Sequence, residues 1–198
     1  MSMLRTFSFP ISYSSYMIQN DWTLYGTPML TTVLRSQQEK NVEADTRIVV
    51  HVMHALVNGA NVIQVRTVDT YVVVILVGTF HEMSALHPLE DIWVAFGMGK
   101  NFHFLSIKSI SEYLGKEVSQ GLPVFHSFTG SDTTSAFRGK GKKSAWQAWQ
   151  SVMHFTDTLQ HIALNLFGLL DAESPYFKSL MRFTVVLYSK NMCADFSK

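Results

Sequence analysis

Four acidic residues stand where a metal-dependent phosphodiester reaction could use them. Glu43 and Asp45 lie two residues apart, Asp69 follows a short apolar run, and Asp132 lies in a Gly-Ser-Asp-Thr motif. Carboxylate oxygens are the ligands that Mg²⁺ prefers, and two such ions can activate a water and stabilise a leaving oxygen. Carboxylates that converge without a cation repel one another. If these four acids converge in the fold, they imply a bound metal ion.

Each acid also has a purely structural interpretation. Glu43 and Asp45 stand in the first turn of a predicted helix, where the helix dipole favours acids, and their spacing points them to nearly opposite faces. Asp69 could cap the helix that follows it, and Asp132 could equally be a helix N-cap. The sequence leaves both interpretations open for each residue.

A basic, glycine-rich segment follows Asp132. Its members are Arg138, Gly139, Lys140, Gly141, Lys142 and Lys143. Glycine lets a backbone approach a phosphate closely, and a helix that starts after Lys143 would point its unpaired N–H groups at the same anion. The segment does not match the G-x-x-x-x-G-K-[ST] loop of nucleotide-binding proteins. We expect these six residues to bind nucleic-acid backbone, with a solvated basic turn as the alternative.

The hydrophobic pattern predicts the elements that would position the acids. Residues 1–38 show no sustained period and are left as an unassigned extension. From Asn41, which fits an N-cap, apolar residues repeat at helical spacing until a stop at Asn58 and Gly59. Residues 61–66 predict a strand, which places Asp69 beyond its carboxyl end, where open α/β sheets bind ligands. Residues 70–80 suit either a buried strand or a crossover helix, and we favour the helix.

The remaining pattern predicts a hairpin followed by helices. Residues 92–96 and 102–107 predict two strands around a turn at 97–101, and a short helix over 108–114 closed by Gly115. Pro123 is expected to break the chain, and helices are expected over residues 124–129, 144–150, 152–166 and 176–187. The expected fold class is therefore α/β, a small sheet followed by a helical half.

Taken together, these motifs resemble the core of the flap-endonuclease and XPG-type nucleases, which have a PIN-like fold. The resemblance rests on Glu-Ala-Asp at 43–45, on the strand-end Asp69 with a second position two residues on, and on Gly-Ser-Asp at 130–132 before the Gly-Lys-Gly-Lys turn. Order and approximate spacing both fit. The resemblance covers about residues 40–190, and residues 43–80 and 122–149 resemble more closely a group of animal proteins with the same core.

The resemblance implies a PIN-like domain over residues 39–190, with a small, mainly parallel sheet and flanking helices in 39–121 and a helical part in 122–190. It implies that Glu43, Asp45, Asp69 and Asp132 bind Mg²⁺ or Mn²⁺, with Asp69 and Asp132 as the catalytic residues. Residues 139–143 would form a helix-hairpin-helix-like turn that grips the backbone of nucleic acid, in particular DNA.

Departures from the family pattern predict weak or lost hydrolysis. The family has a second Asp two residues after the strand-end acid, where this chain has Tyr71, which is uncharged at neutral pH and a poor Mg²⁺ ligand. The family's N-terminal strands bring further acids, whereas Asp21 is the only acid before Glu39, so these strands are expected to be missing. Ser131 replaces the usual Cys. The chain resembles a truncated, partly degenerate member that binds its metal weakly.

Composition narrows the class of protein further. A formal net charge of +1 over 198 residues excludes a uniformly basic protein that coats nucleic acid. Cys193 is the single cysteine, which excludes an intramolecular disulfide and favours a reducing, intracellular compartment, with the nucleus as one candidate. The most apolar run, 72–77, is far shorter than the roughly 20 residues of a membrane helix, and no signal-peptide pattern is present. We expect a soluble protein without a membrane partner.

Two other hypotheses fit the same residues. The chain could be a non-catalytic interaction domain whose acids are only helix caps and whose hydrophobic helices dock a protein, or a fragment that folds poorly because missing strands leave a sheet edge exposed. His51 and His54 share a predicted helix face but lack an evident third metal ligand. Trp146 and Trp149 are expected to pack inside the helical half.

Overall fold

The computed structural model describes residues 5–6, 44–131, 134–165 and 170–189, and of residues 5–6 and 44–46 it describes the backbone alone. The predictions for Asn41, Glu43 and Asp132 fall outside these ranges. The chain divides into two compact units, Met1–Ser119 and Gln120–Lys198. Each unit is described by itself.

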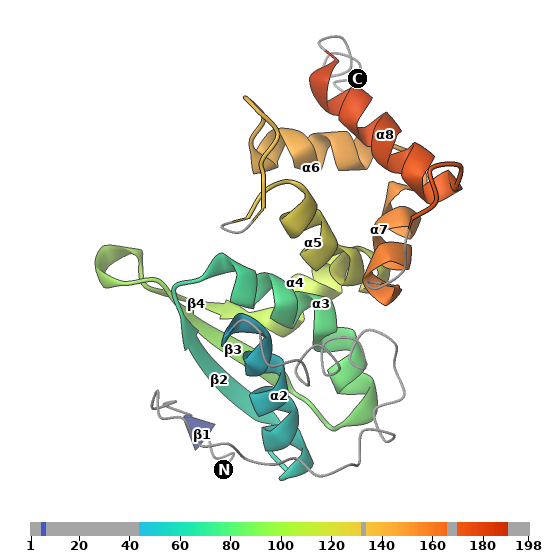
Figure 1. Cartoon of the computed structure of the whole chain (residues 1–198). Coiled ribbons are helices and arrows are strands. Elements are labelled where there is room, and N and C mark those ends of the chain that lie inside the picture. The colour runs from blue at the N-terminus through green and yellow to red at the C-terminus, as the bar shows by residue number, and fades with distance from the viewer. Residues whose placement is uncertain (1–4, 7–43, 132–133, 166–169, 190–198) are drawn as a thin grey trace. The chain divides into compact units, whose positions relative to one another are not determined.

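The first unit is built on a mixed sheet (Figure 1). Its strands are β1 (Arg5–Thr6), β2 (Val62–Thr67), β3 (Asp91–Phe96) and β4 (His103–Ser106), which lie in the order β1-β2-β3-β4. The β1–β2 and β2–β3 pairs are parallel, and the β3–β4 pair is antiparallel. The expected α/β class is thus confirmed. The expectation that N-terminal strands are missing was wrong for β1, because a strand of two residues is too short to leave a period in the sequence.

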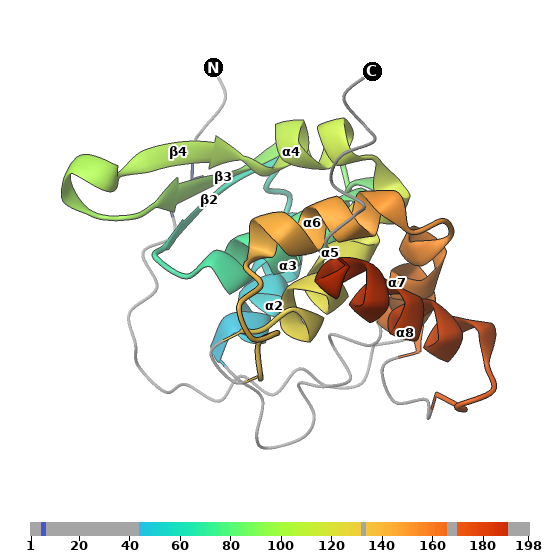
Figure 2. The ribbon, with the colours of Figure 1, turned by 90° about the horizontal axis from the view of Figure 1, so that it is seen from above.

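Helices α2 (Ala44–Val57) and α3 (Thr70–Leu86) lie on the same side of this sheet (Figure 2). The strand residues Ile63, Val65, Ile92 and Val94 are buried, as an alternating strand pattern requires when one face is covered. Two parallel neighbours need a crossover connection, and α3 supplies it between β2 and β3. The helical prediction for residues 70–80 is therefore confirmed.

The predicted hairpin and the short helix after it are also present. Ala95 pairs with Phe104 across the antiparallel strands, and a 3-10 helix, η2 (Gly99–Asn101), forms the turn. Gly97 has a φ of 83°, and a Cβ there would lie 2.6 Å from the carbonyl oxygen of Asn101, so no other residue fits. Helix α4 (Ile107–Leu114) ends at Gly115, whose φ of 78° suits a glycine cap.

The second unit is helical. Helix α5 (Lys116–Phe128) crosses the division between the units, and α6 (Lys142–Ser151), α7 (Phe155–Leu164) and α8 (Pro175–Tyr188) follow it. The rings of Phe155 and Phe183 stack with their centroids 4.5 Å apart, and both residues are fully buried. This stacked pair joins α7 to α8 in the core of the unit.

The expectation that Pro123 breaks the chain was wrong, because Pro123 lies inside α5. A proline within a helix removes one backbone hydrogen bond and crowds the preceding turn. The helix continues past it because residues on both sides are buried against neighbours: Gly121 lies against Leu159, and the ring of Phe125 lies 4.8 Å from that of Trp149.

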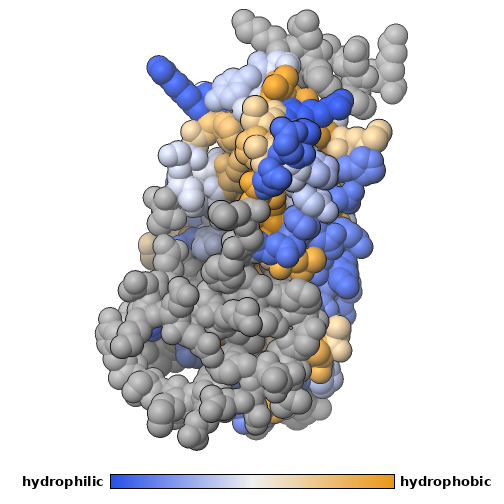
Figure 3. All heavy atoms as spheres, turned by 45° about the vertical axis from the view of Figure 1, so that its right-hand side comes forward, coloured by the Kyte–Doolittle hydropathy of each residue, from blue (hydrophilic) through white to orange (hydrophobic). Residues whose placement is uncertain are grey.

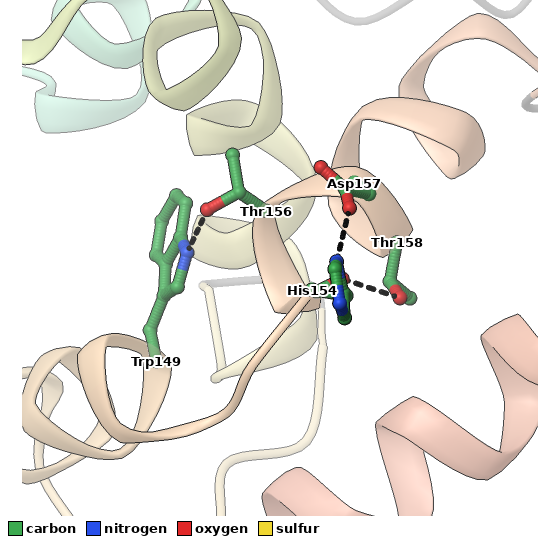
Figure 4. Close-up of polar contacts among 5 residues, drawn as sticks. All are labelled: Trp149, His154, Thr156, Asp157 and Thr158. Atoms are coloured by element: carbon green, nitrogen blue, oxygen red, sulfur yellow. Dashed lines mark hydrogen bonds and ion pairs between the residues drawn. The ribbon is translucent and has the colours of Figure 1, made fainter.

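The single helix expected over residues 152–166 is instead preceded by a sharp joint between α6 and α7 (Figure 4). His154 has a φ of 59°, a left-handed conformation that interrupts a helix. Its Nδ1 lies 2.9 Å from Oδ2 of Asp157, and Trp149 Nε1 donates to Thr156 Oγ1 at 2.9 Å. These two contacts set the angle at which the chain enters α7.

No helix in the described ranges is both long enough and apolar enough to span a membrane.

Gly121→Ala is expected to lower the free energy of unfolding by about 1–2 kcal/mol, as overpacking of a filled interior usually does. The new Cβ would lie 2.9 Å from Cβ of Leu159 and 3.7 Å from the Trp149 ring, which outweighs the gain in helix propensity. Urea unfolding followed by tryptophan fluorescence measures the change. Gln147→Ala, at an exposed position of α6, is the control and should leave stability within about 0.5 kcal/mol. A Gly121→Ala protein as stable as the parent chain would contradict the packing described.

Candidate functional site

Asp69 lies just beyond the carboxyl end of β2 and caps α3. Its Oδ1 accepts a hydrogen bond from the backbone N–H of Tyr71 at 2.7 Å, and its own N–H donates to Thr67 Oγ1 at 3.0 Å. The structural interpretation of Asp69 as an N-cap is thus confirmed. A carboxylate has two oxygens, so capping through Oδ1 still leaves Oδ2 as an acceptor at the strand end.

Tyr71 occupies the first turn of α3, two residues after Asp69, and is half-buried. This turn holds no acid, although the helix dipole would favour one there. The position at which a nuclease of the resembled family places its second Asp therefore carries a phenol, and Asp69 is the only acid among residues 62–81.

The four candidate metal ligands cannot be assembled from the described residues. Glu43 and Asp132 lie outside them, and of Asp45, which lies in α2, the structure describes only the backbone. Within the described ranges, no three His, Cys, Asp or Glu side chains come together in a group that could hold a metal ion. Asp69, the one candidate whose carboxylate is described, does not by itself make a Mg²⁺ site. The metal site, and the pairing of Asp69 with Asp132, stay predictions.

The residues after Asp132 bear on its capping interpretation. Residues 134–141 form no helix, and the next one, α6, begins at Lys142. Thr134 instead ties the loop down, because its Oγ1 donates to the Ser127 carbonyl at 2.7 Å and accepts from the Ser131 N–H at 2.8 Å. The described chain thus supplies no helix immediately after Asp132 for it to cap.

The basic segment belongs to a loop that other elements of the second unit hold in place. The ring of Phe137 packs on those of Phe128 and Phe183, at 5.3 and 6.1 Å between centroids. The hydroxyl of Tyr188 at the end of α8 donates to the Arg138 carbonyl at 3.1 Å, and the Lys140 N–H closes a turn on the Phe137 carbonyl at 3.0 Å. We call residues 134–143 the basic loop; aromatic packing and backbone hydrogen bonds fix its path.

Lys142 has a structural role at the base of this loop. Its Nζ donates to the His126 carbonyl at 2.5 Å and to Thr129 Oγ1 at 2.8 Å, which places the ammonium at the carboxyl-terminal end of α5. A cation there satisfies a terminal carbonyl and complements the helix dipole. Partial burial lowers the pKa of Lys142 from its ordinary value of 10.5. Lys142, one of the six predicted phosphate-binding residues, thus uses its charge within the fold.

The other cations of the basic loop are more available. Arg138 and Lys143 are exposed, and Gly139 makes the turn between them with a φ of 71°. Lys140 Nζ lies 5.4 Å from the centre of the Tyr188 ring, and this cation–π contact keeps the Lys140 ammonium close to the basic loop. Residues 134–156 contain no Asp or Glu, so the side chains of this stretch carry no negative charge.

Helix α6 starts two residues earlier than predicted, at Lys142, with Gly141 as its N-cap. Gly141 offers no side-chain hydrogen bond to the helix, and the first turn holds no acid. The first N–H groups of a helix have no intrahelical partner, and they carry the positive end of its dipole. The start of α6 is therefore a positive, uncapped backbone end beside Arg138 and Lys143 in sequence.

The remaining candidates are explained by the fold. Partial desolvation, followed by the charges of His54 and Arg47, lowers the pKa of His51 from its ordinary value of 6.5. These three side chains are exposed and share helix α2, where they make a basic strip. Trp149 is buried and its ring lies 4.9 Å from that of Trp146, which confirms that this pair packs within the helical unit.

Sequence reasoning missed two residues that position the candidate regions. Asp91 is buried at the start of β3, where its Oδ1 accepts from the Lys108 N–H at 3.0 Å and its Oδ2 accepts from Ser106 Oγ at 2.7 Å. These contacts join β3 to the beginning of α4. The other is Tyr188, which holds the basic loop from 50 residues away. No local sequence pattern indicates contacts at such separations.

Comparisons with protein-family models, with curated proteins and with solved structures found no match to this chain. The resemblance to flap-endonuclease-type proteins therefore stays a prediction from the sequence motifs.

Lys142→Met is expected to lower the free energy of unfolding by about 1 kcal/mol, because it removes the cation that caps α5 while keeping an apolar stem of similar length. Lys143→Met is the matched control. Its side chain is exposed and should leave stability within about 0.5 kcal/mol. Urea unfolding of the two variants side by side decides the issue, and equal stabilities would show that Lys142 does not cap α5.

Proposed function

We propose that the chain is a nucleic-acid-binding protein that grips the sugar-phosphate backbone through the basic loop and the start of α6. The observation that carries this proposal is the uncapped amino-terminal end of α6 at Gly141, which follows a loop of cations and has no acid in its first turn. An ordinary helix start favours a capping oxygen or a carboxylate at these positions. A phosphate supplies the same oxygens from outside.

The side chains around this helix start suit a phosphodiester. Arg138 can present two parallel N–H donors to one phosphate, and Lys143 adds a point charge from the first turn of α6. Both are exposed, whereas Lys142 is engaged at the end of α5. Because no base-reading element is needed, we expect binding to depend on the backbone and to be insensitive to sequence.

We further propose that the chain is related to structure-specific, metal-dependent endonucleases and that its phosphodiester hydrolysis is weak or lost. Support comes from Asp69, which lies at the carboxyl end of a parallel strand, the edge at which open α/β sheets bind ligands. Tyr71, in the position of the family's second acid, supports the loss of activity. Asp69 would hold Mg²⁺ or Mn²⁺ together with the predicted ligands Glu43, Asp45 and Asp132.

Lys143→Gln and Arg138→Gln are each expected to weaken binding of a fluorescein-labelled duplex DNA. Each variant should also reduce the slope of log K against log salt by about one for each phosphate that it no longer neutralises. Fluorescence anisotropy at several salt concentrations measures both quantities. DNA of two unrelated sequences should respond alike, because the protein is expected to touch only the backbone.

Lys178→Gln is the matched control for this experiment. Lys178 is an exposed cation of α8 that pairs with Glu173 at 2.8 Å, so it lies in the same unit but is already neutralised by a neighbour. It should leave affinity and salt slope nearly unchanged. If the Lys143 and Lys178 variants lose the same affinity, binding reflects the overall charge and the proposed interface is wrong.

Mn²⁺ binding tests the proposed metal site. Asp69→Asn should abolish the heat of Mn²⁺ binding in isothermal titration calorimetry, while Asn keeps a capping oxygen at the start of α3. Tyr71→Asp should strengthen binding, since it restores a carboxylate ligand two residues on. Rapid Mg²⁺-dependent cleavage of flap DNA by the parent chain would contradict the prediction of weak hydrolysis.

One observation favours a second candidate function, a non-catalytic interaction domain. Helix α8 exposes Met181, Val185 and Tyr188, which are spaced to lie on one helix face, at 56%, 63% and 46% of their surface. Hydrophobic side chains gather over the second unit and are bordered by hydrophilic ones (Figure 3). Under this alternative, the melting temperature should not change with Mn²⁺, because a metal that binds the native state must stabilise it.

A further inference from the structure

The sheet of the first unit has an outer face that α2 and α3 do not cover (Figure 2). Ile63, Val65, Ile92 and Val94 point inward, so their neighbours along each strand point outward. The outward residues that matter here are Arg66 of β2, Trp93 of β3, Phe104 of β4 and Phe102 just before β4. We call these four residues the aromatic face.

The register of the strands brings these side chains together. Arg66 pairs with Ala95, and Ala95 pairs with Phe104, so a small residue separates the guanidinium from the ring across three strands. The Phe102 and Phe104 rings meet edge to face with centroids 5.2 Å apart, and Arg66 Cζ lies 5.8 Å from the centre of the Phe102 ring. The guanidinium and two rings thus make one connected surface.

These aromatic side chains are exposed to an unusual degree. Trp93 is 38% exposed, Phe102 39% and Phe104 53%. Large aromatic residues on a sheet normally bury their rings against a covering layer, because each ring buries a large apolar area. The Phe102 and Phe104 rings contact each other and, like Trp93, remain partly open to solvent.

The turn between β3 and β4, at one end of the aromatic face, carries no acid. Residues 92–111, which include β4, the turn before it and all of β3 except Asp91, contain Lys100, His103 and Lys108 but no Asp or Glu. Two acids border this stretch. Asp91 is buried, and its oxygens accept hydrogen bonds from Ser106 and Lys108, whereas Glu112 is exposed on α4. Anionic partners are therefore favoured at the end of the face that carries Arg66, Phe102 and Phe104.

We propose that the aromatic face binds single-stranded nucleic acid, with bases stacked on Phe104 and Trp93 and a phosphate on Arg66. Exposed rings interleaved with cations are the arrangement that binds single strands without sequence preference, because every base has a π-face. Gln64, which flanks Trp93 on β2, adds amide atoms that an apolar protein partner would leave buried and unpaired. The inference does not depend on the function proposed for the basic loop, since it uses other residues in the other unit.

Fluorescence anisotropy of the full chain with fluorescein-labelled oligo(dT), and with oligo(U) in a second arm, tests this proposal. The double variant Trp93→Thr/Phe104→Thr keeps residues that favour strands and should raise the Kd for single strands at least about fivefold. Arg66→Gln should raise the Kd and lower the salt slope. The two arms show whether DNA or RNA is preferred.

Tyr113→Thr is the matched control. Tyr113 is the one aromatic residue of α4, is 90% exposed and lies outside the aromatic face, so its removal should leave the Kd unchanged. Circular dichroism of each variant, with a melting temperature close to that of the parent chain, shows that the fold is intact. Because a variant could still unfold, protection of Trp93 from oxidation by bound oligo(dT) is a second readout on the parent chain.

The two proposals fail separately. Loss of single-strand affinity in the aromatic-face variants with unchanged duplex affinity supports the aromatic face, whatever the outcome for Lys143→Gln. Single-strand affinity that is equal in folded Trp93→Thr/Phe104→Thr and in the parent chain overturns it. Size-exclusion chromatography in which the parent chain is a dimer and the double variant a monomer also overturns it, because the face then binds a second copy.

Discussion

The parallel pairing of β2 with β3 is the constraint on which the first unit depends. Two parallel neighbours cannot be joined by a tight turn, so the chain must return across the sheet. It does so through α3, a 17-residue helix that is buried along most of its length. That return fixes the strand end at which the crossover begins, and Asp69 stands there as the cap of α3. The place of the candidate acid thus follows from strand direction.

The same pairing divides the sheet into two faces of different character. The fully buried inward residues of β2 and β3 are aliphatic and pack under the helices, as buried parallel strands require. The outward residues include an arginine and aromatic rings, and the antiparallel β4 extends this face by adding Phe104. In the second unit, ring packing among Phe128, Phe137, Phe155 and Phe183 has the organising role that strand pairing has in the first.

Local patterns were sufficient to predict most of the elements. The strand over 61–66, the hairpin with its glycine turn and the helix closed by Gly115 carry their information within a few residues, and all are present. The prediction that Pro123 breaks the chain was wrong because the burial of residues on both sides of it outweighs one lost hydrogen bond. The joint at His154 was missed because a left-handed residue other than glycine has no signal in the hydrophobic period. The roles of Lys142, Asp91 and Tyr188 depend on partners 13 to 50 residues away, which periodicity cannot show.

The anchoring of the basic loop has a consequence for how much a ligand could gain there. Flexible segments that order on binding give up part of the interaction energy as lost conformational entropy. Here the Phe137 ring, the Tyr188 hydroxyl and the Lys142 ammonium already hold the backbone of residues 137–142 between α5 and α8. The entropy of ordering this backbone is lost when the unit folds, before any phosphate arrives. A bound phosphate would still have to order chiefly the side chains of Arg138 and Lys143. The start of α6 is therefore a preorganised anion-binding site, and its affinity is limited by its small number of charges.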